Sequence, residues 1–449
     1  MKKITFLLTV LAVSFLFTSA SAKEYPYEWL SLGISESPAT IQRVRWRTKT
    51  DLPQAVAELT PARPSPDLWN DVTLYQAESE IEDDYGVVRS YHHITFDNLI
   101  PDTKYLYRIG DGNERWSEWY EFKTTKTTDD EFSFIYISDV QVGIHDHYPR
   151  VIRQAIRSSA DASFIMFAGD LTGGASEWEW NAFFQSNSWI FGMLPVVPIP
   201  DSHEYTHGKL TTYWDHLFSY PENTPKELSE QGNYFFDYQG CRFLMINTKE
   251  LLSGSEEYRA QALAWIEEKL ATNPHKWCVV QQHRPIYSVA EGRSSEGIYE
   301  PLNPLYEKYD VDLVLTGHDH IYARMRGENS PKDSDRLSGP IHVVSIAGSQ
   351  VYVPEFYTYV ERTGSNIQLY QSVTINEHHL EFKAYLATGE LYDHFLISKS
   401  GDSKSFTDKA AGWPEITDIP TKTWQVYTEE DMARFRRQRE EYLRSKSSK

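Results

Sequence analysis

Residues 311–322 read VDLVLTGHDHIY, and this stretch decides the fold. Its first half is an apolar run that predicts a buried strand. Gly317, His318, Asp319 and His320 follow where that strand ends. His318 and His320 are adjacent but one on an extended turn, so their imidazoles can reach two metal ions. Open α/β sheets carry their sites at the carboxyl ends of the strands, so the stretch predicts a metal site on a layered α/β domain.

Four further apolar runs end in residues of the same kind. Helix-like segments lie between them, and apolar strands that alternate with helices indicate a layered α/β core. Carboxylate oxygens and imidazole nitrogens suit zinc, iron or manganese, and one carboxylate can bridge two ions. The runs are FSFIYISD, which ends in Asp139; SFIMFAGD, which ends in Asp170; LPVVPIPDSHEY, which contains Asp201, Ser202, His203 and Glu204; and KWCVVQQHRPIY, which contains His283.

Each of these motifs has a structural interpretation when it is taken alone. An Asp after a strand often caps the helix that follows. A buried His such as His283 is often a hydrogen-bonded core residue. Five such strand ends in one chain favour a common metal site over five separate structural roles.

The region before the α/β segment has the pattern of an all-β domain. Val44 and Trp46 alternate with arginines, which is the period of a half-buried strand. The text L-x-P-x-T-x-Y-x-Y at residues 99–107 resembles the late strands of a fibronectin type III-like sandwich, in which a Tyr packs at a corner. A Thr/Lys/Asp-rich stretch at 124–130 is the predicted linker.

The five motifs together resemble the calcineurin-like metallophosphoesterase superfamily, over about residues 30 to 395. The leading sandwich and the H-R-P-x-Y and G-H-x-H blocks are most similar to the purple acid phosphatases. The resemblance implies an α/β (α+β) four-layer metallophosphoesterase sandwich, preceded by an all-β immunoglobulin/fibronectin III-like sandwich. It also implies two divalent or trivalent ions, zinc, iron or manganese.

The resemblance assigns a role to each motif residue. Asp139 and His320 would hold the first metal, His283 and His318 would hold the second, and Asp170 would bridge them. A hydroxide that bridges the metals would attack phosphorus. His203 would stabilise the transition state or protonate the leaving group, so His203 and Asp170 are the expected catalytic residues. His203, Glu204 and Tyr322 are the expected substrate contacts.

Three positions depart from the purple acid phosphatase pattern. Gly173 stands where the resemblance expects the Tyr that colours those enzymes, so this protein should not be purple. Gln141 could ligate the first metal through its amide oxygen or hydrogen-bond nearby. Ser202 replaces the usual Asn ligand of the second metal, and Asp201 precedes it. Water could fill the gap, Asp201 could turn inward, or the second metal could bind weakly.

The N-terminus has the pattern of a secretory signal peptide. Lys2 and Lys3 precede an apolar run, and Ala20-Ser21-Ala22 ends it. Cleavage after Ala22 would make the protein secreted or periplasmic, without a membrane anchor. We expect four segments: a signal peptide at 1–22, a fibronectin III-like domain at 23–126, a catalytic domain at 131–399, and a tail with a helix at 400–449.

Composition limits the partners. The formal net charge is −20, which argues against a nucleic acid polymer or an anionic membrane as the partner. A small phosphate-ester substrate remains possible if bound metals supply the local positive charge. The sequence leaves the oligomeric state open. It also leaves open whether Cys241 and Cys278, the chain's 2 cysteines, form a disulfide or are buried free thiols in neighbouring strands.

The predicted function is therefore an exported metal-dependent phosphohydrolase that cleaves phosphate mono- or diesters. The alternative is a metal-poor, catalytically impaired binding protein on the same fold, which the replacement at Ser202 suggests. Metal content separates the two hypotheses.

Overall fold

The structure is a computed structural model that describes residues 23–50, 54–68, 71–331, 334–401, 403–421, 423 and 425–447. The predicted signal peptide, with its cleavage after Ala22, lies outside these residues. Within the described ranges, no helix combines the length and the apolar character that crossing a bilayer requires.

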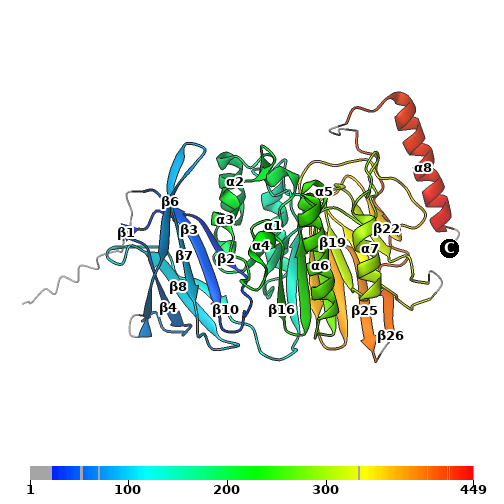
Figure 1. Ribbon diagram of the computed structural model, residues 1–449. Helices are drawn as coiled ribbons and strands as arrows, with labels where there is room; N and C mark the ends of the chain where they lie inside the picture. Colours follow the sequence, from blue (N-terminus) through cyan, green and yellow to red (C-terminus); the bar gives the residue numbers. More distant parts are fainter. Residues whose placement is uncertain are drawn as a thin grey trace, which may run out of the picture.

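The N-terminal domain consists of two β-sheets that pack face to face (Figure 1). Trp46, Ile94, Tyr107 and Phe122 lie in the core between them. Tyr105 accepts a hydrogen bond from the Ile100 backbone N–H at 2.9 Å, which is the corner contact that the sequence predicts. One sheet contains β1 Lys23–Glu24, β4 Val56–Pro61, β5 Thr73–Gln76, β8 Lys104–Gly110, β9 Arg115–Trp116 and β10 Tyr120–Lys123; the other contains β2 Glu28–Gly33, β3 Gln42–Thr48, β6 Glu78–Asp84 and β7 Val87–Phe96.

The second of these sheets continues into the α/β domain. β2 pairs in parallel with β13 Val196–Pro198 through Gly33 and Val196. The result is an 11-stranded sheet of order β26-β25-β24-β23-β11-β12-β13-β2-β3-β7-β6. Its remaining strands are β11 Phe132–Ile137, β12 Ile165–Phe167, β23 Leu369–Ile375, β24 His379–Leu386, β25 Leu391–Ser400 and β26 Ser403–Asp408.

A 7-stranded sheet of order β16-β17-β18-β19-β21-β20-β22 packs against the 11-stranded sheet. Because β11 is buried on both faces, it is apolar except at Ser133: Phe134 and Tyr136 face the other sheet, and Ile135 and Ile137 face helices. The strands of the 7-stranded sheet are β16 Tyr234–Tyr238, β17 Cys241–Ile246, β18 Trp277–Gln282, β19 Leu313–Thr316, β20 Tyr322–Arg326, β21 Ile341–Val344 and β22 Arg362–Gly364. A small hairpin contains β14 Tyr205–Thr206 and β15 Lys209–Leu210.

Helices cover the outer faces of both sheets, so the predicted four-layer arrangement is confirmed (Figure 1). Trp180 and Phe183 of α2 pack on the 11-stranded sheet, and Trp265 and Leu302 pack on the 7-stranded sheet. The helices are α1 Tyr148–Ser158, α2 Glu177–Phe191, α3 Tyr213–Leu217, α4 Lys226–Ser229, α5 Thr248–Ser253, α6 Glu256–Ala271, α7 Tyr299–Lys308 and α8 Glu429–Ser447, with a 3₁₀ turn η2 at Ser202–Glu204.

The two cysteines are buried free thiols in neighbouring strands. Cys241 of β17 is paired with Trp277, and Cys278 of β18 is paired with Arg242. Because of this one-residue offset the two side chains point to opposite faces: Cys241 packs between the sheets and Cys278 packs against the helices.

The region predicted as a tail contributes a strand and a docked helix. β26 lies beyond residue 399 and pairs with β25, so the sheet continues into that region. In α8, Phe435 and Tyr442 are 0% and 2% exposed, as the predicted apolar stripe requires, whereas Met432 is half-buried. Arg434 of α8 binds Glu291 at 2.8 Å, which ties the helix to the loop that follows β18.

Truncating Phe435 should release this helix without unfolding the body. A buried Phe→Ala change costs about 3–5 kcal/mol, and here that loss falls on the docking of one terminal helix. We expect Phe435→Ala to accelerate cleavage within residues 425–447 in limited proteolysis while the main melting transition moves little. Glu440→Ala, at an exposed position of the same helix, is the control. Equal protection of both variants would contradict the prediction.

Candidate metal centre

Five loops meet at one edge of the two sheets, where β11, β12, β13, β18 and β19 end. Five of the motif residues on these loops are buried. Asp139, Asp201 and His283 are 0% exposed, and Asp170 and His320 are 3% and 1% exposed. The sequence-predicted strand ends therefore come together in a shielded cluster.

His283 is the shared member of two groups of possible ligands. One group is Asp139, Asp170 and His283, and the other is Asp201, His283 and His318; within each, the ligand atoms lie within 4.8 Å of one another. His283 Nε2 is 3.2 Å from Asp170 Oδ2 and 4.0 Å from Asp201 Oδ1. This sharing places two possible ion positions side by side.

His320 and Gln141 extend the first group. His320 Nε2 lies 3.3 Å from Asp139 Oδ1 and 3.3 Å from Gln141 Nε2. Gln141 is 2% exposed. The residues that the sequence predicts for a first metal thus lie around Asp139.

Backbone carbonyls orient two of the imidazoles. His283 Nδ1 donates to the Ala168 carbonyl at 2.6 Å, and His320 Nδ1 donates to the Gln350 carbonyl at 2.9 Å. A carbonyl oxygen can only accept, so Nδ1 carries the proton in both rings. Nε2 is then the atom that faces the carboxylates, which is the orientation that metal-ligating histidines adopt.

Two buried polar atoms point to a cation. His283 Nε2 and Gln141 Oε1 are buried and make no hydrogen bond. Buried polar atoms are normally paired, and an ion is one explanation for an exception. His283 Nε2 belongs to both ligand groups, and Gln141 contacts His320 beside them; such oxygen and nitrogen donors suit zinc, iron or manganese. The residues present therefore fit metal ions.

The charges of the cluster are strongly coupled. Burial disfavours the charged form of His283, but the carboxylates of Asp170, Asp201 and Asp139 outweigh it and raise its pKa to about 10. Burial likewise opposes ionisation of Asp170, but His283 and the other nearby histidines hold the pKa of Asp170 well below its usual range. Burial, His283 and two arginines lower the pKa of His318. The cluster therefore favours the ionised form of Asp170.

Glu204 holds the loops of the site together and does not make the substrate contact that the sequence predicts. Its carboxylate is 0% exposed and accepts backbone N–H groups from Leu171 at 2.7 Å and Asp201 at 2.9 Å. Asp170 and Thr172 donate to the same carboxylate. With all these donors inside the protein, Glu204 has no oxygen left for a substrate. Burial and the charge of Asp170 raise the pKa of Glu204 to about 8.

His203 faces outward, unlike the other motif histidines. Its side chain is 41% exposed, and Nε2 lies 3.9 Å from Asp170 Oδ2. Nδ1 donates to the Gly173 carbonyl at 2.8 Å. A Cβ on Gly173 would lie 2.6 Å from Glu179 Oε1, so Glu179 takes up the space of a side chain there. Nε2 of His203 is the nitrogen left free at the mouth of the cluster.

Asp201 turns inward. Its Oδ1 accepts hydrogen bonds from the Ser202 backbone N–H at 2.7 Å and from Arg284 Nη2 at 3.2 Å, and its Oδ2 accepts from Thr248 Oγ1 at 3.4 Å. The carboxylate of Asp201 therefore lies with His283 and His318, where it could take the place of the missing Asn ligand.

Tyr322 lies away from the cluster. It is 0% exposed, and its hydroxyl donates to Asp393 Oδ2 at 2.6 Å. The side chain packs in the core between the sheets. The predicted substrate contact of Tyr322 is therefore wrong, because Tyr322 is directed into the core.

The loops are tight and partly strained. Asp139, Asp170, His318 and His320 have φ values of 50°, 52°, 69° and 49°. Non-glycine residues in this left-handed region cluster at functional sites. A Cβ at Gly317 would lie 1.9 Å from Ser138 Oγ and 2.0 Å from Asp139 Oδ2. Only glycine allows this approach of the two loops.

Sequence reasoning did not identify Arg293. This residue lies in the loop between β18 and α7, and its Nη1 is 3.1 Å from His318 Nδ1. Its guanidinium also lies over the Tyr352 ring, 4.7 Å from the ring centre. No strand end or motif marks it, so the sequence held no signal for it.

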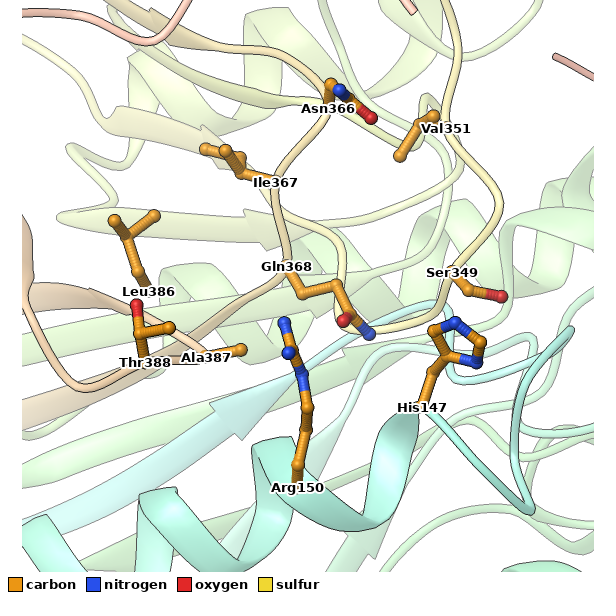
Figure 2. Close-up of a pocket in the computed structure, with 10 residues that line it drawn as sticks. All are labelled: His147, Arg150, Ser349, Val351, Asn366, Ile367, Gln368, Leu386, Ala387 and Thr388. Atoms are coloured by element: carbon orange, nitrogen blue, oxygen red, sulfur yellow. The ribbon is translucent and has the colours of Figure 1, made fainter. Parts of the chain in front are cut away.

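A separate cavity of about 320 Å³ lies beside the cluster, and Figure 2 shows its lining. Ser349 borders it and precedes Gln350, whose carbonyl orients His320. His147 and Arg150 at the start of α1 point toward it from the other side (Figure 2). The cavity shares no lining residue with the two ligand groups.

Comparison with known families follows the same division of the chain. Residues 29–124 match the model of the purple acid phosphatase N-terminal domain, and residues 132–322 match that of the calcineurin-like phosphoesterases. The chain is therefore similar to the calcineurin-like phosphoesterases over residues 132–322. Residues 29–124 add the likeness to the purple acid phosphatases.

Individual relatives are distant. The Arabidopsis thaliana protein described as probable inactive purple acid phosphatase 24 is 27% identical over 363 residues, 69% of this chain and 57% of that protein. Purple acid phosphatase 1 of Ipomoea batatas is 27% identical over 254 residues, 52% of this chain and 51% of that protein. The chain thus spans little more than half the length of these relatives.

A solved structure of a purple acid phosphatase from yellow lupin (Lupinus luteus) seeds has the same fold. It matches with a TM-score of 0.69 at 20% sequence identity and covers 90% of this chain and 78% of that one.

A side chain at Gly317 should disable the cluster. Gly317→Ala forces Asp139 away from its position, so we expect zinc affinity to fall by at least about tenfold, the scale of losing an orienting contact at a metal site. Titration calorimetry on chelator-treated protein measures it. Gly174→Ala is the control, because a Cβ there meets only Glu179 Oε2 at 3.8 Å. Unchanged zinc affinity in Gly317→Ala would show that Asp139 is not a ligand.

The inward turn of Asp201 gives a second prediction. We expect Asp201→Ala to lose about one equivalent of bound metal, because a site with one ligand fewer binds weakly. Ser202→Ala should retain the metal content of the wild type. Elemental analysis after gel filtration measures both. Loss of metal in Ser202→Ala alone would return the ligand role to Ser202.

Proposed function

We propose that this protein is a metal-dependent phosphohydrolase that cleaves small phosphate esters. The observation that carries the proposal is the buried cluster of carboxylates and imidazoles around His283, whose Nε2 has no hydrogen-bond partner. An outward-facing His203 lies beside it. The match of residues 132–322 to the calcineurin-like phosphoesterases supports a phosphoesterase, and the proposal covers both mono- and diesters.

The ligands divide between two ions. Asp139, His320 and Gln141 would hold the first ion, and His283, His318 and Asp201 would hold the second; Asp170 would bridge. The division follows the two groups of donor atoms and the contacts of His320. Zinc, iron and manganese all accept such donors.

Two bound cations would polarise the phosphoryl oxygens and lower the pKa of a water that can attack phosphorus. The side chains of the protein supply the remaining functions. His203 Nδ1 is committed to the Gly173 carbonyl, so Nε2 is the atom that can hold a proton for the leaving oxygen. Glu204 keeps the loop of Asp170 and the loop of Asp201 in fixed relation.

The positive charge of Arg284 offsets the negative charge that Asp201 brings to the expected site of the second metal. The resemblance expects a neutral Asn at Ser202, whereas this chain presents the carboxylate of Asp201. Arg284 Nη2 lies 3.2 Å from Asp201 Oδ1, so the pair is neutral in total. This pairing supports an active hydrolase over the alternative, a metal-poor, catalytically impaired binding protein.

Export is part of the proposal. Residues 1–22 have the three parts of a signal peptide, and cleavage after Ala22 would place the protein outside the cytoplasm. N-terminal sequencing of the mature protein tests this point.

Removing either a bridging or a terminal ligand should abolish hydrolysis. We expect Asp170→Asn and His318→Ala each to lower the rate on an aryl phosphate by more than about 10²-fold, because they remove electrostatic stabilisation of the transition state. Rates are measured on purified protein loaded with zinc or manganese. His378→Ala, which removes an exposed His in the turn between β23 and β24, should keep full activity.

Metal content separates the proposal from its alternative. Two equivalents of transition metal in the wild type support the hydrolase. No bound metal, or unchanged turnover in loaded Asp170→Asn, would overturn it.

A further inference from the structure

Arg293 is a cation in the site that the proposed ligand set does not use. It is half-buried in the loop between β18 and α7. Its Nη1 lies at hydrogen-bonding distance from His318 Nε2 and 3.1 Å from His318 Nδ1. The guanidinium thus lies against the imidazole that belongs to the second ligand group.

The charge of Arg293 is not neutralised by a contacting acid. Among the residues that the structure describes, no carboxylate lies within 4.0 Å of its guanidinium. Arg284 differs, because Asp201 pairs with it at 3.2 Å. Asp319 lies nearby, but its carboxylate already accepts from Ser288 Oγ at 2.9 Å and the Val289 N–H at 2.6 Å. Among the described residues Arg293 therefore has no carboxylate in direct contact, and Asp319 acts on it only through space.

Several contacts keep Arg293 in place. Its guanidinium lies 4.7 Å from the ring centre of Tyr352. The loop is tied to its neighbour by Glu291 N–H donating to the Val353 carbonyl at 2.9 Å. Arg434 of α8 binds Glu291 from outside at 2.8 Å. These contacts hold the Arg293 side chain in place, so it loses little further side-chain entropy when it binds a ligand.

Arg293 donates to the imidazole of His318, which a metal ion would also bind. A neutral imidazole has a single lone pair, and a guanidinium has N–H donors and no acceptor. A cation bound by His318 uses that lone pair, so Arg293 must find another acceptor. A planar guanidinium matches the oxygens of a phosphoryl group, and a charge-assisted contact of this kind is strong.

We propose that Arg293 exchanges acceptors: it donates to His318 until the second cation binds there, and then it donates to a phosphoryl oxygen of the substrate. Arg293 is in this view the residue that recognises phosphate, and it competes with the metal for His318. The inference rests on the proposed function for the identity of the ligand.

The exchange makes opposite predictions for two affinities. In Arg293→Gln, zinc should bind to chelator-treated protein about threefold more tightly or better, because a competing donor and a repelling charge are gone. Inorganic phosphate should bind to the zinc-loaded variant roughly tenfold more weakly, the cost of one charge-assisted hydrogen bond. Titration calorimetry measures both affinities without turnover.

Two further variants complete the design. Arg293→Lys keeps the positive charge but lacks the paired N–H donors of the planar guanidinium. Its phosphate affinity should therefore lie between those of wild type and Arg293→Gln. Arg157→Gln removes an exposed arginine at the end of α1 and should change neither affinity. If Arg293→Gln fails to fold, the comparison of Arg293→Lys with wild type decides.

The outcomes separate this inference from the proposed function. Phosphate affinity unchanged in Arg293→Gln, zinc affinity that does not rise, or no zinc binding by the wild type would each overturn the role of Arg293. If both affinities change as expected while loaded wild type hydrolyses no phosphate ester, Arg293 keeps its role and the hydrolase proposal falls.

Discussion

The imidazole of His283 joins the two sheets at the point where the site forms. It extends from the end of β18 in one sheet, and its Nδ1 donates to the carbonyl of Ala168 at the end of β12 in the other. Gly169, with a φ of +86°, leaves room for the ring, since a Cβ there would lie 2.9 Å from Nδ1. The other nitrogen is thereby held among three carboxylates. The same hydrogen bond therefore constrains both the packing of the two sheets and the geometry of the site.

Local sequence patterns predicted the parts of the site that lie directly after strands. Asp139, Asp170, His283 and His318 each follow an apolar run, and a parallel sheet brings the ends of its strands to a common edge. The directions of Glu204 and Tyr322 were not predictable in this way. Glu204 lies in a 3₁₀ turn that directs it back to backbone donors, and Tyr322 begins a strand whose inner face is core. Arg293 depends on the path of a loop, which has no periodic signal.

The net charge of −20 describes the whole surface, whereas binding of a small anion depends on a few side chains. At the centre the local balance is different from that of the surface. Asp201 is paired with Arg284, and Arg293 has no contacting carboxylate among the described residues. Bound metals would supply the positive charge that the carboxylates of Asp139, Asp170 and Asp201 otherwise outweigh. A small phosphate ester is then compatible with an acidic protein.

The pairing of β2 with β13 joins the two domains into one folding unit. Along the chain there are two domains, but the parallel pairing of β2 with β13 at Gly33 and Val196 places strands of both in one sheet. Without β2, the edge of β13 would be open, and an open edge is a template for pairing with another chain. The N-terminal domain therefore closes the catalytic sheet. We infer that the two domains unfold as one cooperative body, and that the sandwich contributes to the solubility of the enzyme core as well as to its stability.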